Sequence, residues 1–95
     1  MTHIPPEIKN YTEFLNAQPK DAQSTVYYSL CLMMVEEGKM TLANRLASED
    51  GVIYVFRSGT GEEFRVARPD IGYEDDALMV RALRMVLRDE GMLQD

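Results

Sequence analysis

The chain has 95 residues, of which 45% are hydrophobic and 27% are charged, and its sixteen acidic against ten basic side chains give a formal net charge of -6. A chain of this length buries only about 60–65% of the surface that its unfolded form exposes, so we expect one core and a single domain over residues 1–95. The negative charge disfavours general nucleic-acid binding, and the longest apolar runs, Leu30 to Val35 and Val52 to Phe56, are far shorter than the roughly 18 residues of a membrane span.

The first part of the chain predicts two helices. Apolar residues recur at helical spacing from Ile8 to Leu15, after a proline-rich start, which predicts a short amphipathic helix that ends before Pro19. The segment from Asp21 to Gly38 predicts a second helix, because it has a polar start, a long apolar stretch and a terminal glycine. Apolar side chains cover nearly its whole circumference. This helix therefore either lies between other elements of the fold or contacts a partner.

The middle of the chain predicts three strands. A strand is predicted from Met40 to Ala47, where Met40, Leu42, Asn44 and Leu46 alternate with Thr41, Ala43, Arg45 and Ala47. The residues from Glu49 to Gly51 predict a turn. The segment from Val52 to Phe56 is β-branched and aromatic on both faces, which is typical of a central strand. A second turn, from Ser58 to Gly61, leads into a third strand from Glu62 to Arg68. The sequence therefore predicts an antiparallel β-meander.

An alternative interpretation makes Thr41 to Glu49 a short helix, because Leu42, Ala43 and Leu46 also fit one helical face. The fold would then be winged-helix-like, with a helix-turn-helix followed by a hairpin.

The last part of the chain predicts a loop and a helix. Asp70 to Tyr73 is expected to be the loop, and Glu74 to Gly91 the helix, with acidic residues at the positive end of the helix dipole. Apolar residues fill a wide arc of this helix, while Arg81, Arg84 and Arg88 share one narrow stripe. The order helix, helix, three strands, helix predicts an α+β domain (ααβββα) with its helices packed on one face of the sheet.

The order of one helix, three strands and a final helix, from about Asp21 to Gly91, resembles that of the double-stranded-RNA-binding domain. The resemblance is in topology only, and no motif of that family is present. Where the family has a lysine cluster that grips phosphates, at the start of the final helix, this chain has Glu74, Asp75 and Asp76. The chain is therefore not assigned to that family.

Few residues of the chain point to catalysis or metal binding. The only histidine, His3, is near the terminus, and Cys31 lies among apolar residues, so we expect no nucleophilic site and no zinc site. The acidic residues Asp70 and Glu74 to Asp76 lack the spacing of a calcium-binding loop. The glycines at 59 and 61 predict a hairpin turn, since no lysine or following helix accompanies them. We therefore expect no enzymatic activity, no metal and no cofactor. The single cysteine also makes a reducing, cytoplasmic location the default expectation.

The arginines and the surplus apolar side chains indicate where a partner would bind. Guanidinium groups at the spacing of the last helix suit carboxylates or phosphates, although they also stabilise a helix C-terminus without any ligand. An almost wholly apolar second helix and seven methionines favour a protein partner, in the first place a second copy of the chain. The candidate partner-binding residues are Tyr28, Met33, Met34, Arg81, Arg84 and Arg88.

Three functions follow as hypotheses. The first is a non-enzymatic protein–protein interaction or regulatory module that forms a homodimer through apolar helix faces. The second is a nucleic-acid-binding regulator, which would use the arginines of the last helix together with Arg57, Arg65 and Arg68 of the sheet. The third is a small-ligand-binding protein or enzyme without a recognisable motif.

Overall fold

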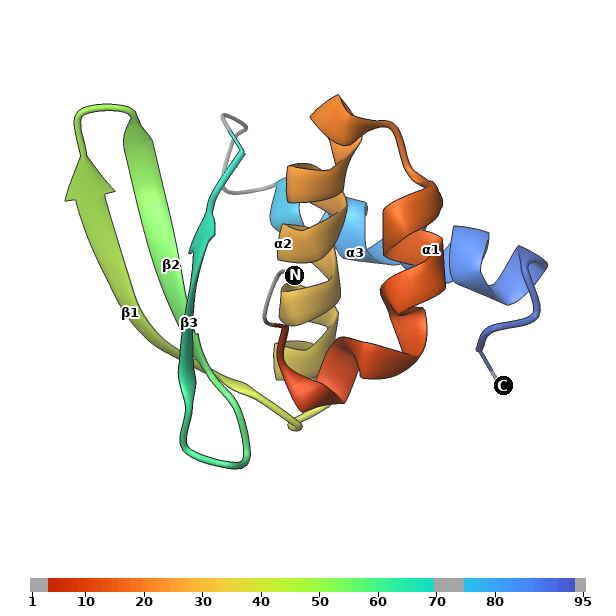
Figure 1. Ribbon diagram of the computed structural model, residues 1–95, viewed down its shortest axis with the longest axis horizontal. Coiled ribbons are helices and arrows are strands. Elements are labelled where there is room, and N and C mark those ends of the chain that lie inside the picture. The colour runs from red at the N-terminus through yellow and green to blue at the C-terminus, as the bar shows by residue number, and fades with distance from the viewer. Residues whose placement is uncertain (1–3, 70–74, 94–95) are drawn as a thin grey trace.

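The structure, a computed structural model, describes residues 4–69 and 75–93 and contains helices on one side of a three-stranded sheet (Figure 1). The elements in chain order are the 3-10 helix η1 (Pro6–Tyr11), the α-helices α1 (Thr12–Ala17) and α2 (Lys20–Glu36), the strands β1 (Thr41–Ser48), β2 (Gly51–Arg57) and β3 (Glu63–Ala67), and the α-helix α3 (Asp75–Asp89). This order confirms the predicted α+β fold. The predicted loop from Asp70 to Tyr73 lies outside the described residues.

The sheet is antiparallel with the order β1-β2-β3, so β2 is the central strand, as the sequence predicts. Arg45 of β1 and Val66 of β3 lie on either side of Tyr54 of β2. The register of β1 shifts between Leu42 and Asn44, and a bulge of this kind disrupts pairing along an edge strand. Because residues 41–48 form a strand, the winged-helix-like alternative is wrong.

Helix α2 lies at the centre of the fold. Figure 1 shows it between the sheet and α1, with α3 behind it, and it contacts η1, α1, β3 and α3. Its residues from Tyr28 to Cys31 are consecutive and all buried. Four consecutive residues point in four directions around a helix, so the rest of the chain covers the middle of α2 on every side. Of the two expected arrangements for this helix, the structure shows the internal one.

The first predicted helix differs from expectation in its geometry. It occupies the predicted segment, but its first half, η1, is a 3-10 helix and only its second half, α1, is α-helical. Pro5 and Pro6 have no backbone N–H, and the first turn is closed by the N–H of Ile8, which donates to the carbonyl of Pro5 at 3.1 Å. The tighter turn also buries the Ile8 side chain in the core.

Two glycines end the long helices. Gly38 follows α2 with φ of 77°, and Gly91 follows α3 with φ of 75°. After α2, the N–H of Lys39 donates to the carbonyl of Met34, and after α3 the N–H of Met92 donates to the carbonyl of Leu87. These are the bonds of a Schellman motif, which needs a residue with positive φ and therefore favours glycine.

A buried polar network joins α2, the end of β3 and α3. The Tyr28 hydroxyl donates to Asp76 Oδ2 at 3.1 Å, and the Arg68 guanidinium donates to Asp76 Oδ1 at 3.1 Å. The guanidinium carbon lies 6.0 Å from the ring centre of Tyr28 and 5.9 Å from that of Tyr54. Burial by itself lowers the pKa of Arg68, but the Asp76 carboxylate acting together with Tyr28 and Tyr54 outweighs burial and raises that pKa. Arg68 is therefore a charged part of the core.

Candidate interaction surfaces

The structure places the three α2 candidates inside the molecule. Tyr28 and Met33 are 0% exposed and Met34 is 1% exposed. The prediction that these side chains lie at a partner-facing surface is therefore wrong, because the sheet, α3 and the N-terminal helices already cover them. The long apolar stretch of α2 reflects its central position in the core and does not mark a free face.

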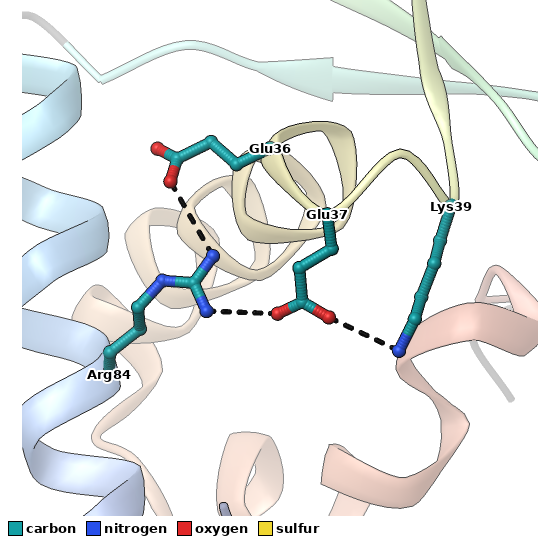
Figure 2. Close-up of polar contacts among 4 residues, drawn as sticks. All are labelled: Glu36, Glu37, Lys39 and Arg84. Atoms are coloured by element: carbon teal, nitrogen blue, oxygen red, sulfur yellow. Dashed lines mark hydrogen bonds and ion pairs between the residues drawn. The ribbon is translucent and has the colours of Figure 1, made fainter. Parts of the chain in front are cut away.

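Arg84 also differs from expectation, because it binds within the chain (Figure 2). Its guanidinium donates from Nη1 to Glu37 Oε2 at 2.9 Å and from Nη2 to Glu36 Oε1 at 3.5 Å. The Lys39 ammonium lies 3.1 Å from the other Glu37 oxygen. Burial by itself raises the pKa of Glu37, but the bonds from Lys39 and Arg84 outweigh it and hold that pKa below its usual range. Arg84 therefore connects α3 to the end of α2.

The remaining arginines do not form one open basic patch. Arg57 pairs with Glu63 at 2.8 Å, and Arg68 is buried beside Asp76, so two of the three arginines that the nucleic-acid hypothesis assigns to the sheet are neutralised within the chain. Arg65 and Arg81 are exposed, as is Arg88. Arg45, on the helix-facing side of β1, lies over the Tyr54 ring at 5.3 Å. Because Arg57 and Arg68 are paired with carboxylates of the chain, the structure gives no support to a combined phosphate-binding surface of the sheet and α3.

An apolar surface remains on α3, which carries all three of the large hydrophobic side chains that the described part of the chain leaves exposed. Leu78 is 57% exposed, Met85 59% and Val86 45%. Together with the exposed Ala82, they follow the spacing i, i+4, i+7, i+8, which places them along one side of a helix. The other side of α3 buries Val80, Leu83 and Leu87 in the core. We call the four exposed residues the α3 outer face.

The predicted site residues do not include the α3 outer face, although the sequence predicts a wide apolar arc on the last helix. The signal in the sequence is that apolar residues occupy two sets of helical positions, where one set is enough for a helix that packs on one side. The sequence alone does not say which set faces the core. That depends on where α2 lies.

The only cysteine of the chain is enclosed in the core. Cys31 is fully buried, and burial raises the pKa of its thiol to about 12, so it is protonated at neutral pH. His3, Asp70 and Glu74 lie outside the described residues. Residues 4–69 and 75–93 contain no group of three histidine, cysteine or acidic side chains placed to hold a metal ion. Within the same residues no helix is long and apolar enough to cross a membrane.

The turn between β2 and β3 is a hairpin turn, as predicted. The N–H of Gly59 and the hydroxyl of Ser58 donate to the carboxylate of Glu7, at 2.9 Å and 2.8 Å. These donors of the turn therefore bind a carboxylate of the chain itself. The contact also fixes η1 against the hairpin.

No protein-family model matches the chain, and no curated protein or solved structure is significantly similar to it.

Proposed function

We propose that the protein is a non-enzymatic protein–protein interaction module that self-associates through the α3 outer face. The observation that carries this proposal is the exposure of Leu78, Met85 and Val86 on one side of a helix whose other side is already packed. Contiguous exposed apolar side chains on an otherwise polar surface are typical of contact sites between proteins.

A second copy of the chain is the simplest partner for this surface. In a two-fold symmetric contact the same residues meet on both sides, so each apolar side chain that one copy exposes is covered by an apolar side chain of the other. Full burial of one such side chain contributes about 1.5–3 kcal/mol before the cost of association is subtracted. The α3 outer face consists of four residues, whereas a standard interface involves roughly 20–30 residues on each side, so we expect a dimer that dissociates on dilution.

The test is the solution mass, measured by light scattering after size-exclusion chromatography over a dilution series. The unmodified chain is expected to approach the mass of a dimer at high concentration and that of a monomer on dilution. The double variant Leu78→Glu, Met85→Glu is expected to stay monomeric throughout. Lys9→Glu is the control, because it makes the same change in net charge at an exposed position of η1.

Circular dichroism and urea unfolding show whether each variant is folded. If the unmodified chain remains monomeric at the highest concentration, the proposal is contradicted. A double variant that is folded and still dimerises like the Lys9→Glu control places the contact elsewhere on the molecule.

A further inference from the structure

The free edge of β3 offers an ordered row of backbone groups. The N–H of Ser58 donates to the carbonyl of Glu62, and the N–H of Arg68 donates to the carbonyl of Val52. In an antiparallel ladder such pairs alternate with pairs that exchange no bonds. The even-numbered residues from 62 to 68 therefore bond to β2. Glu63, Arg65 and Ala67 direct their N–H and C=O groups away from β2, toward the open edge of the sheet.

A groove of about 360 Å³ runs along this edge. All five residues of β3 line it, together with Ser24 and Tyr27 of α2. Figure 1 shows β3 as the strand beside α2, and the two elements are in contact. A strand that bonded to the edge of β3 would therefore place alternate side chains under α2, next to Val66 and Tyr27, and the others on the sheet face that none of the described helices covers.

The charges at this edge indicate which type of residue the added strand should carry opposite Arg65. The Arg65 side chain is exposed on the uncovered face, and no hydrogen bond or ion pair holds it within the described part of the chain. The nearby charges are already matched, because Glu63 pairs with Arg57 at 2.8 Å. An acidic side chain directly opposite Arg65 would complete a cross-strand ion pair.

We propose that the groove between β3 and α2 binds an extended segment of a partner protein in which an acidic residue lies between two apolar residues. The segment adds a fourth strand antiparallel to β3, with its acidic side chain opposite Arg65 and its flanking apolar side chains beside Val66 and Tyr27. Backbone bonds to Glu63, Arg65 and Ala67 supply sequence-independent affinity, and the side chains supply selectivity. This site is separate from the α3 outer face and does not depend on self-association there.

A foreign segment fits this groove better than the β3 strand of a second copy. The acidic residue of β3 itself, Glu63, is held by Arg57 and follows another acidic residue, Glu62, so β3 lacks the alternation of apolar and acidic residues that the groove selects. Ser24 and Tyr27 of α2 also line one side of the groove. The space therefore suits a single strand rather than a second sheet with a helix packed on it.

The test uses the full chain and two synthetic peptides that adopt extended conformations. One has a glutamate between two valines, the other has a lysine at that place, and the two are otherwise identical. Binding is followed by NMR titration of backbone amides. The glutamate peptide is expected to bind about threefold to tenfold more tightly, and to shift the amides of Glu63, Arg65 and Ala67. Arg65→Glu is expected to reverse the preference, while Arg81→Glu, the same charge change on α3, leaves it unchanged.

A second variant tests the backbone part of the proposal. Ala67→Pro removes one edge-directed N–H and none of the donors to β2, and proline is tolerated on edge strands in such positions. This variant is expected to bind both peptides about threefold more weakly, and its circular dichroism spectrum is expected to match that of the unmodified chain. Equal affinity for the two peptides, an unchanged preference in Arg65→Glu, shifts confined to other surfaces, or the absence of binding by either peptide would overturn the proposal.

Discussion

Helices α2 and α3 are both rich in apolar residues, yet α2 is buried in the core whereas α3 is buried on one side only. Six residues of α2 are buried, in several directions around its axis, whereas α3 buries only Val80, Leu83 and Leu87 and exposes three large apolar side chains. The apolar content of a helix therefore does not tell how much of it is free for a partner. The number of elements packed around it decides that, and α2 has the sheet on one side and helices on the others.

The most direct test of this difference between α2 and α3 is the same substitution in both helices. Met33→Ala in α2 is expected to lower the free energy of unfolding by about 2–5 kcal/mol, because it leaves a cavity in a packed core. Met85→Ala in α3 is expected to change it by at most about 0.5 kcal/mol, because that side chain is 59% exposed. Urea unfolding at a concentration where the chain is monomeric measures both. Similar losses in the two variants would mean that α2 is not internal.

The next largest effect concerns how the buried side of α3 is held to α2. Asp76→Asn removes the negative charge opposite the enclosed Arg68 guanidinium, and we expect a loss of about 2 kcal/mol. Asp75→Asn is the matched control, since Asp75 is exposed in the same first turn and has the same relation to the helix dipole. Urea unfolding compares them. Equal losses would assign the effect to the helix dipole and not to the buried pair.

Most of the architecture can be predicted from the sequence because it depends on local signals. Helical periodicity, the alternation in β1 and the β-branched residues of β2 predict every described element except the 3-10 geometry of η1. Gly38 and Gly91 marked the helix ends because their positive φ is a local requirement.

The contacts between distant segments were not readable from the sequence. Tyr28 and Asp76 are hydrogen-bonded across 48 positions, and nothing in the sequence near either residue indicates the other. Helical spacing groups Arg84 with Arg81 and Arg88, which is correct along α3 but does not show that Glu36 and Glu37 lie within reach. The sequence also predicts the apolar arc of α3, but which part of it faces the core depends on tertiary packing.

A smaller and pH-dependent effect is expected for Glu7, which holds η1, one of the elements that cover α2. Burial raises the pKa of its carboxyl, but the Gly59 N–H and the Ser58 hydroxyl outweigh that effect, so the folded pKa lies below the ordinary value of 4.5. The resulting stability is present above about pH 4.5 and is lost as the pH falls through the lower folded pKa. Glu7→Gln is expected to cost about 1 kcal/mol at pH 7 and less at acidic pH.

Urea unfolding between neutral pH and pH 3 measures this difference, with Glu13→Gln at an exposed position of α1 as the control. A constant difference between Glu7→Gln and the unmodified chain over the whole range would show that the Glu7 carboxylate does not contribute through its charge.

The smallest effect is expected where α2 and α3 meet at the surface. Arg84 joins Glu36 and Glu37, but its side chain is 30% exposed and the two carboxylates are 49% and 26% exposed, so water screens the attraction. Arg84→Met, which keeps most of the apolar stem, is expected to cost about 0.5 kcal/mol, and this cost should shrink in high salt. Arg81→Met on the exposed side of α3 is the control and should cost nothing measurable. A loss for Arg84→Met that is large and insensitive to salt would mean that α3 depends on this contact for its position, and that the buried residues Val80, Leu83 and Leu87 do not hold it against α2 by themselves.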